Sequence, residues 1–320
     1  MFSAIAFLLL GLIILLIGGD IFVKGSSSLA KRFGISPIVI GLTIVAFGTS
    51  APELVINLFS AASGASDLAF GNILGSNISN VFLVLGIAAI IRPLAVKRGT
   101  TWKEIPFSIL VIFVLFLLAN DVMFGNNGEN ILTRGDGLVL ISYFFIFMYY
   151  TYGLTKAEGE KEDVEKFKPW TSSTFILGGI ACLTLGGKLM VDNAIILAKI
   201  AGLSELLIGL TITAVGTSLP ELVTSAIAAY RGHVDIAIGN VVGSNIFNVL
   251  WVLGLTPIVS PMAVGMEINQ DILVAGIAAA LLFIFMFIGG KRGRYILQRW
   301  QGALFILLYI SYTAFVIFRG

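Results

Sequence analysis

Two glutamates lie in long apolar stretches, at equivalent positions of an internal repeat. The segment Gly41–Gly86 returns at Gly209–Gly254 with a constant offset of 168 residues, and 27 of the 46 aligned positions are identical. Each copy holds one glutamate, Glu53 or Glu221, in a GTSxPE string. A carboxylate at membrane depth costs at least about 2.5 kcal/mol, so it persists where it is paired, protonated or facing a water-filled path. Because neither copy holds an equally deep lysine or arginine, we interpret the two carboxylates as cation ligands rather than protonated core groups.

Both glutamates directly follow a proline, which predicts a break in each surrounding helix. Pro52 and Pro220 have no N–H group, so the carbonyls of Gly48 and Gly216, four residues earlier, lose their usual donor. Freed carbonyls at membrane depth are tolerated only where they are buried in protein or line a cavity. Hydroxyl oxygens lie beside both breaks, on Thr49, Ser50, Thr217 and Ser218. We therefore expect carboxylate, hydroxyl and carbonyl oxygens to converge at the two breaks.

A second repeated string, GNxxGSNxxN, supplies further oxygen atoms. Its glycines form GxxxG pairs, which are typical of closely packed membrane helices. Residues four apart share a helix face, so each copy presents one serine and one asparagine together. These residues are Ser76 with Asn80 in the first copy and Ser244 with Asn248 in the second. We expect glycine packing to bring this face against the glutamate helix of the same copy. Asn77 and Asn245 are expected to bond or cap neighbouring backbone.

The candidate ligands offer oxygen atoms but neither thiolate nor imidazole. Cys182 is the only cysteine and His233 the only histidine, which excludes a cysteine zinc cluster, HExxH proteases and histidine-based triads. Carboxylate, amide, hydroxyl and carbonyl oxygens suit hard cations such as Ca²⁺ and Na⁺, whereas Mg²⁺ holds its waters and prefers octahedral geometry. The sequence therefore predicts a site for hard cations such as Ca²⁺ and Na⁺. We expect no enzymatic activity, no resident cofactor and no nucleic-acid partner.

The composition places this site in an all-α polytopic membrane protein. Hydrophobic residues make up 58% of the 320 residues and charged residues 12%, about half the charged fraction of soluble domains. About 20 mainly apolar residues span a bilayer. Ten segments meet this need: residues 3–24, 37–62, 68–91, 103–120, 136–155, 172–192, 205–230, 236–260, 269–288 and 301–318. Gly, Pro, Ser and Asn interrupt the second, third, seventh and eighth segments, so we expect these four helices to be broken around a midplane cation site.

The basic residues predict how the ten segments are oriented. With the N-terminus outside, 16 of the 20 lysines and arginines fall at inner ends or in inner loops, as the positive-inside rule requires. Both termini are then extracytoplasmic. The hydrophilic linker 155–170, on the cytoplasmic side, divides the chain into repeats 1–154 and 171–320, each with five spans. An odd number of spans inverts the second repeat relative to the first, a plan found in secondary transporters, and brings the two glutamate motifs face to face.

Two charged stretches are also repeated at the same offset. GGDIFVKG contains Asp20 and Lys24, and GGKLMVDN contains Lys188 and Asp192, with the signs exchanged. Each pair is spaced by four residues, so we expect local ion pairing. The helices that carry them, at 3–24 and 172–192, are glycine-rich and lightly charged. We expect them to form a sliding or rocking gate.

The paired GTSxPE and GNxxGSNxxN strings resemble those of the cation/calcium exchanger superfamily, in particular its compact prokaryotic sodium/calcium exchangers. The resemblance covers both repeats and thus essentially the whole chain. It implies an antiporter with one calcium site and flanking sodium sites, which exchanges three sodium ions for one calcium ion. The implied ligands are the carboxylates of Glu53 and Glu221, the carbonyls of Thr49 and Thr217 for calcium, the hydroxyls of Ser50, Ser76, Ser218 and Ser244 with the carbonyls of Ala46 and Ala214 for sodium, and Asn80 and Asn248 at the centre.

Several alternatives differ in coupling or in class. Some prokaryotic relatives and the potassium-dependent exchangers have aspartate where this chain has Asn248, which argues against potassium cotransport. Proton-coupled relatives carry GNxxE in place of GTSxPE, which favours sodium coupling. Proton/calcium exchange and potassium-dependent sodium/calcium exchange remain the alternatives within the transporter class. Outside it, a cation channel would share the oxygen-lined midplane, and an intramembrane enzyme is disfavoured by the single histidine. We expect a functional monomer in the cell membrane.

Overall fold

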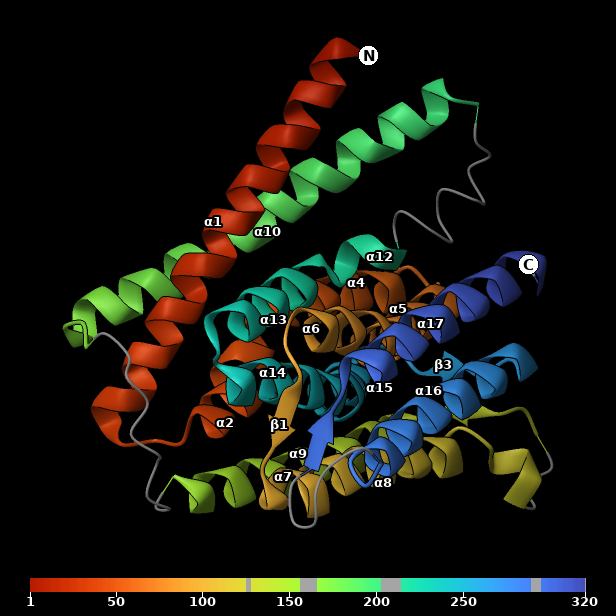
Figure 1. The fold of residues 1–320 in the computed structure, drawn as a ribbon. Coiled ribbons are helices and arrows are strands. Elements are labelled where there is room, and N and C mark those ends of the chain that lie inside the picture. Colours follow the sequence, from red (N-terminus) through yellow and green to blue (C-terminus); the bar gives the residue numbers. More distant parts are fainter. Residues whose placement is uncertain (125–127, 156–165, 203–213, 289–294, 320) are drawn as a thin grey trace.

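The protein is described by a computed structural model that covers residues 1–124, 128–155, 166–202, 214–288 and 295–319. Of the helices in these ranges, eight are long and apolar enough to cross a membrane, or nine if one bent pair counts as a span. The structure is therefore an all-helical polytopic membrane protein (Figure 1). The expected span 205–230 falls partly on residues 203–213, and the linker 155–170 largely on residues 156–165. Both of these ranges lie outside the described residues.

The described helices divide between the two halves of the chain. The first half contains α1 (Phe2–Phe33), α2 (Pro37–Ile40), η1 (Gly41–Val45), α3 (Ala46–Thr49), α4 (Ala51–Ala62), α5 (Ser66–Ser79), η2 (Asn80–Leu85), α6 (Gly86–Ile91), α7 (Arg98–Trp102), α8 (Glu104–Leu118), η3 (Asp121–Phe124) and α9 (Arg134–Leu154). The second half contains α10 (Pro169–Ile200), α12 (Ala214–Thr217), α13 (Leu219–Arg231), α14 (Val234–Phe247), η5 (Asn248–Val252), α15 (Leu253–Val259), α16 (Met266–Phe285) and α17 (Arg299–Arg319). The segments η1, η2 and η5 are π-helical, and η3 is a 3₁₀-helix.

The two glutamate helices break where the sequence predicts. Ser50 separates α3 from α4 with φ −86° and ψ 4°, and Ser218 separates α12 from α13 with φ −86° and ψ 5°. Pro52 and Pro220 then occupy the first turn of the new helix, where a missing N–H costs nothing. In the first copy the two parts of the helix are bent by 46°. The breaks place both glutamates at the start of a short helix.

The third and eighth spans correct a prediction, because they are not broken. Residues 66–91 run continuously through α5, η2 and α6, and residues 234–259 through α14, η5 and α15. Glycine, serine and asparagine keep their backbone N–H groups, so they weaken a helix without removing its hydrogen bonds. The irregularity appears instead as a π-helical segment, which opens with Asn80 in one copy and Asn248 in the other. Such segments accommodate an extra residue per turn and are frequent at functional sites.

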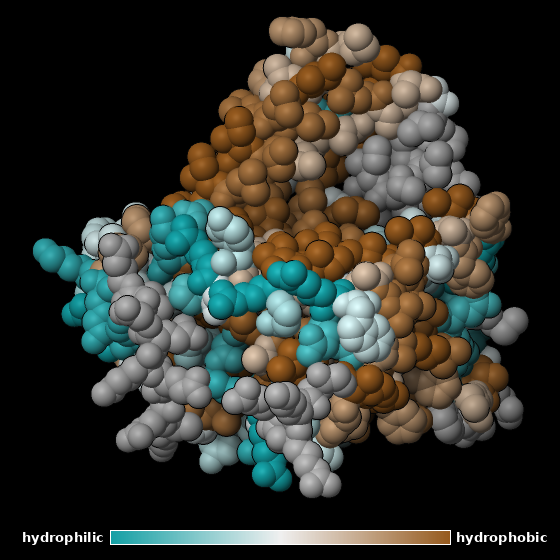
Figure 2. Space-filling view, viewed as in Figure 1, coloured by the Kyte–Doolittle hydropathy of each residue, from teal (hydrophilic) through white to brown (hydrophobic). Residues whose placement is uncertain are grey.

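The two unbroken spans form the centre of the molecule. In its most apolar window, the α14–α15 span is 94% buried and the α5–α6 span 78% buried, whereas α17 is 17% buried and α1 and α10 are each 28% buried. The outer helices expose mainly apolar side chains, and Figure 2 shows hydrophobic residues over much of α1. This distribution is inverted relative to a soluble protein and suits outer helices that face lipid.

Helices α1 and α10 cross as a separate pair, set apart from the other helices in Figure 1. Glycines allow their backbones to touch. A Cβ atom placed on Gly18 would lie 2.7 Å from the Cβ of Cys182, and one on Gly179 would lie 2.6 Å from the Cβ of Phe22. Contacts of this kind are typical of small-residue packing between membrane helices. Towards the rest of the molecule, the pair mainly contacts α13.

Short strands join the two halves at their loops. Strand β1 (Leu94–Val96) pairs antiparallel with β4 (Tyr295–Leu297), and β2 (Ile131–Leu132) pairs antiparallel with β3 (Met262–Ala263). Each pairing thus connects a loop of the first half with a loop of the second. The backbone hydrogen bonds of these ladders tie the two halves together at these loops.

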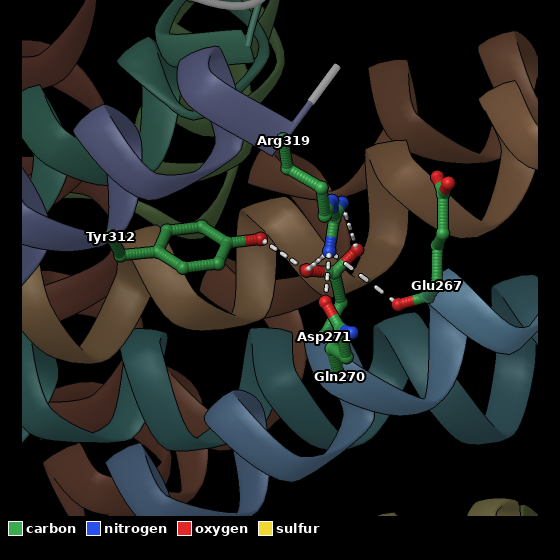
Figure 3. A network of polar contacts seen from close by, with 5 residues as sticks. All are labelled: Glu267, Gln270, Asp271, Tyr312 and Arg319. Atoms are coloured by element: carbon green, nitrogen blue, oxygen red, sulfur yellow. Dashed lines mark hydrogen bonds and ion pairs between the residues drawn. The ribbon is translucent and has the colours of Figure 1, made fainter.

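A polar cluster fastens the end of α17 to α16 (Figure 3). The guanidinium of Arg319 donates to both carboxylate oxygens of Asp271, at 3.0 Å each, and the hydroxyl of Tyr312 donates to one of them at 3.1 Å. Bidentate arginine–carboxylate pairs fix geometry as well as charge. The cluster contains none of the predicted cation ligands and ties α17 to α16.

Candidate cation site

The two glutamates are buried in short helices that follow the breaks. Glu53 is 0% exposed and Glu221 is 1% exposed, in the first turns of α4 and α13. Among the described residues, no lysine or arginine forms an ion pair with either carboxylate. The hydroxyl of Ser50 donates to Oε1 of Glu221 at 3.2 Å, a contact between the two copies of the motif. The two GTSxPE strings are therefore adjacent in space, as the sequence predicts.

The remaining oxygens of these carboxylates accept no hydrogen bond from the described residues. They are Oε1 and Oε2 of Glu53 and Oε2 of Glu221. The same holds for the hydroxyls of Ser76 and Ser218 and for the amide oxygens of Asn80 and Asn248. Of the 12 buried polar side-chain atoms without a partner in this part of the chain, seven thus belong to the predicted ligand set. An unsatisfied buried acceptor costs about 1–3 kcal/mol, so this concentration of seven marks the region as the candidate cation site.

The hydroxyl of Thr49 is used within the protein. It donates to the carbonyl of Val45 at 3.1 Å, lies 3.0 Å from Oδ1 of Asn240 and is 3.4 Å from the hydroxyl of Ser244. Its backbone carbonyl, at the end of α3, is thus the part of Thr49 that remains for a ligand role. Thr217 ends α12 at the equivalent position.

The two alanines of the predicted ligand set open the short helices before the breaks. Ala46 is the first residue of α3 and is buried, and Ala214 is the first residue of α12. The first turn of each short helix thus lies directly before the serine where the chain bends.

The π-helical segments complete the arrangement. η2, which begins with Asn80, packs against α13, and η5, which begins with Asn248, packs against α4. Each central asparagine therefore belongs to a segment that contacts the glutamate helix of the opposite copy. Both side chains are 0% exposed.

The glycine packing corrects a second prediction. A Cβ atom on Gly243 would lie 2.8 Å from the Cβ of Ala46, and one on Gly239 would lie 2.8 Å from the carbonyl oxygen of Ile38. The glycine face of α14 thus packs against the glutamate helix of the opposite copy, not of its own. The reason is the crossing of the two copies, which sets η1 against α14 and brings the small residues of both to the contact. In the first copy the close packing is missing, because a Cβ atom on Gly71 or Gly75 would meet no atom of the described residues within 4 Å.

Four side chains that the sequence analysis did not single out support the glutamate helices from within each copy. Asn72 donates to Oδ1 of Asn57 at 2.7 Å and lies 3.5 Å from the carbonyl oxygen of Glu53. Asn240 likewise donates to the hydroxyl of Ser225 at 2.9 Å and lies 3.4 Å from the carbonyl oxygen of Glu221. The repeat could have identified Asn72 and Asn240, because the Gly-Asn pair of GNxxGSNxxN occurs in both copies.

As ligands, the described side chains of the candidate site offer oxygen atoms only. The candidate ligand atoms are the oxygens of two carboxylates and of hydroxyl, amide and carbonyl groups. No group of three or more His, Cys, Asp or Glu side chains in the described ranges could hold a metal ion. This excludes a thiolate or imidazole centre there and leaves an oxygen site of modest charge, the kind that Ca²⁺ and Na⁺ favour.

Comparison with known proteins assigns the class that this geometry defines. A profile of the family described as sodium/calcium exchanger protein matches residues 3–153 and 171–318. The putative antiporter CaxA of Alkalimonas amylolytica is 37% identical over 98% of both chains. The sodium/calcium exchanger MaX1 of Methanosarcina acetivorans is 32% identical over 95% of this chain and 96% of its own.

A solved structure extends the likeness to three dimensions. The sodium-calcium exchanger NCX_Mj, soaked with 10 mM Na⁺ and zero Ca²⁺, superimposes with a TM-score of 0.83 at 34% identity, covering 97% of this chain and 98% of its own. The chain described here belongs to the sodium/calcium exchanger protein family.

Proposed function

We propose that this protein is a secondary active antiporter that exchanges sodium for calcium ions by alternating access. The observation that carries the proposal is the group of seven buried, unpartnered oxygens contributed by both copies of the motif. The name of MaX1 and that of the superimposed structure, each a sodium/calcium exchanger, support the same substrates.

The ligand roles follow the symmetry of the repeat. Glu53 and Glu221 share the calcium ion, with the carbonyls of Thr49 and Thr217 beside them. Sodium ions take the hydroxyls and carbonyls that flank the carboxylates, from Ser50, Ser76, Ser218, Ser244, Ala46 and Ala214. Asn80 and Asn248 contribute amide oxygens at the centre. Two observations on the described residues support this assignment: the candidate ligand side chains are buried, and neither glutamate has a basic partner.

The charge of the site accounts for exchange. Two ionised carboxylates are neutralised by one Ca²⁺ or by two Na⁺, so the ions compete for the same oxygens. A third Na⁺ leaves one net positive charge on the loaded protein, and each cycle of three sodium ions against one calcium ion then moves one charge. At 100 mV this charge is worth about 2.3 kcal/mol. The sodium gradient and the membrane potential would both drive calcium extrusion.

Alternating access requires a part of the molecule that moves past the site. The α1–α10 pair suits this role, because its helices pack closely on one another and contact the central helices mainly through α13. A sliding or rocking motion of the pair would open the site to one side at a time.

The topology completes the proposal. Ten spans in two inverted five-helix repeats, 1–154 and 171–320, would set both termini on the extracytoplasmic side. The linker 155–170 would lie in the cytoplasm. All ligands come from one chain, so the protein would function as a monomer.

Calcium flux in proteoliposomes tests the coupling. The purified protein is reconstituted, and radioactive calcium uptake is measured under sodium, proton and potassium gradients imposed in turn. We expect uptake driven by an outward sodium gradient, enhanced by an inside-positive potential and independent of potassium. Uptake that follows the proton gradient alone would identify a calcium/proton exchanger instead, and a potassium requirement would identify the potassium-dependent type. A fixed conductance without a counter-ion would identify a channel.

A further inference from the structure

Four buried asparagines form a closed set of hydrogen bonds between the two copies of the motif. Asn77 donates through Nδ2 to the backbone carbonyl of Asn245 at 3.2 Å, and Asn245 donates to the backbone carbonyl of Asn77 at 3.3 Å. Asn80 donates to Oδ1 of Asn245, and Asn248 donates to Oδ1 of Asn77, each at 3.0 Å. All four side chains are at most 4% exposed. Each copy therefore holds an amide of the other.

The two backbone carbonyls determine the orientation of all four amides. A backbone carbonyl can only accept, so Asn77 must turn its NH₂ group towards Asn245. Its own Oδ1 then faces Asn248 and also only accepts, which obliges Asn248 to present its NH₂ group. The oxygen of Asn248 is left on the other side, where it has no hydrogen-bond partner among the described residues. The same sequence of steps leads from the carbonyl of Asn77 through Asn245 to Asn80.

Hydrogen bonds are needed to fix this orientation, because the carboxamide group of asparagine has nearly the same shape in its two orientations. Rotation by a half-turn exchanges oxygen and NH₂, and packing alone distinguishes them poorly. An NH₂ group directed at a cation replaces an attractive dipole by a repulsive one. Asn80 and Asn248 therefore need a partner that holds their oxygens in place if they are to bind cations.

We propose that Asn77 and Asn245 are positioning residues that hold the amide oxygens of Asn80 and Asn248 towards the cation site, each across the interface between the two copies. The inference rests on the proposed function, since it assumes that these oxygens meet Ca²⁺ or Na⁺. The proposal also makes the effect of a substitution at position 77 depend on which residue occupies position 248. An aspartate at 248 would set a carboxylate oxygen against Oδ1 of Asn77, where the structure has a hydrogen bond.

A double-mutant cycle tests positioning against simple packing. Calcium binding to the purified full chain is measured by calorimetry for the wild type, Asn77→Leu, Asn248→Asp and the double variant. Asn77→Leu should weaken calcium binding about tenfold next to Asn248, the size of one net hydrogen bond. It should change binding little, or improve it, next to an aspartate at 248, because a carboxylate presents oxygen in either direction. A tenfold loss in both backgrounds would overturn the proposal and leave a packing role.

A matched control is available in another reciprocal amide pair. Asn120 donates to Oδ1 of Asn269 at 2.8 Å and accepts from its NH₂ group at 2.7 Å, and Asn120 is 3% exposed. Asn120→Leu should lower thermal stability as much as Asn77→Leu and leave calcium affinity unchanged. If Asn77→Leu does not fold, the same cycle is run with Asn77→Ala, whose smaller side chain fits the site. The expected changes in calcium affinity have the same direction in that cycle.

A glutamate variant separates the positioning role of Asn77 from the cation site itself. Glu53→Gln is measured in the same assay. Wild-type calcium binding by Glu53→Gln would refute the cation site itself. Loss of binding in Glu53→Gln together with unchanged binding in Asn77→Leu would refute the positioning role alone.

Discussion

The two copies of the motif have closely similar sequences but different charged surroundings. At the end of α13, Arg231 donates through Nε to Asp20 of α1 at 2.7 Å, and Lys24 pairs with the same carboxylate at 2.9 Å. The residue equivalent to Arg231 in the first copy is Ser63, which donates its hydroxyl to the carbonyl of Ser60 at 2.9 Å. An ion-paired cluster thus ties α1 to α13, whereas the matching end of α4 carries no charge.

The same contrast recurs in other pairs of equivalent residues. Lys188 and Asp192 of α10 lie 3.0 Å apart as a local pair, with side chains 73% and 52% exposed. Asp235 at the start of α14 pairs with Lys97 at 2.8 Å, whereas the equivalent Asp67 lines a recess of about 400 Å³ together with Glu129. The centre of the molecule is thus built from the motif residues that both copies share, whereas the charged residues near the helix ends differ between the copies. If the protein works by the proposed alternating access, a symmetric centre would let one site serve both sides of the membrane, and the unlike ends would give the two access states different energies.

The central glutamates should show the largest effect of substitution, and the same effect in both copies. Glu53→Gln and Glu221→Gln each remove one of the two charges that balance Ca²⁺. Sodium-driven uptake of radioactive calcium should fall on the order of 100-fold or more, as expected for an uncompensated change in a buried charge pair. Glu104→Gln is the control, because Glu104 is 2% exposed and accepts from Tyr150 outside the site. Wild-type uptake by either central variant would contradict the site.

Changing the central amides to carboxylates should alter ion preference rather than expression. Asn80→Asp and Asn248→Asp each add a third negative charge, which favours divalent over monovalent ions by about tenfold through Coulombic attraction at short range. The shift should have the same direction in both copies, and potassium sensitivity is measured in parallel. Unchanged flux and selectivity in one of the two variants would remove that asparagine from the ligand set.

Separating α1 from α10 should reduce stability and flux together. An alanine at Gly179 places its Cβ 2.6 Å from the Cβ of Phe22, so the helices must move apart, at a cost of about 1–3 kcal/mol. The neighbouring Gly178 is the matched control, because its Cβ would lie 3.9 Å from Ile21. Thermal melting in detergent and calcium flux should both decline for Gly179→Ala and remain near wild type for Gly178→Ala. Equal melting temperatures for the two variants would contradict the close packing.

Substitutions in the ion-paired cluster of Asp20, Lys24 and Arg231 should have the smallest effect. They should change the balance between the two access states of the proposed transport cycle. Arg231→Gln releases α1 from α13, and a partly exposed ion pair is worth at most about 1 kcal/mol, or fivefold in an equilibrium. The apparent calcium affinity measured from the two faces of the vesicle should shift in opposite directions. Lys188→Gln, at the exposed local pair of α10, should leave both affinities unchanged. An identical shift on both faces would show that Arg231 acts on the site rather than on the conformational balance.

Local features of the fold could be predicted from the sequence. The breaks at Ser50 and Ser218 follow from the missing N–H group of a proline two residues later, which no neighbour can restore. The ion pairs of Asp20 with Lys24 and of Lys188 with Asp192 follow from their spacing on a helix. The all-helical membrane fold follows from composition.

Contacts across the repeat could not be predicted in the same way. Which helix meets Gly243 depends on how the two copies cross in space, and the sequence of one copy does not contain that information. The expectation that Asn77 and Asn245 bond backbone was correct, but the carbonyl that each one reaches belongs to the opposite copy. The continuous course of residues 66–91 and 234–259 was not predicted, since polar residues loosen a helix without ending it.

Competition between the two ions at one site is the central claim, and calcium affinity as a function of sodium concentration tests it most directly. Calorimetric titration of the wild type with calcium is repeated at rising sodium concentration, with potassium replacing sodium in the control series. We expect the apparent calcium affinity to fall steeply with sodium, by more than in proportion to its concentration, and to remain constant with potassium. Calcium binding that is unaffected by sodium would contradict a shared site between Glu53 and Glu221.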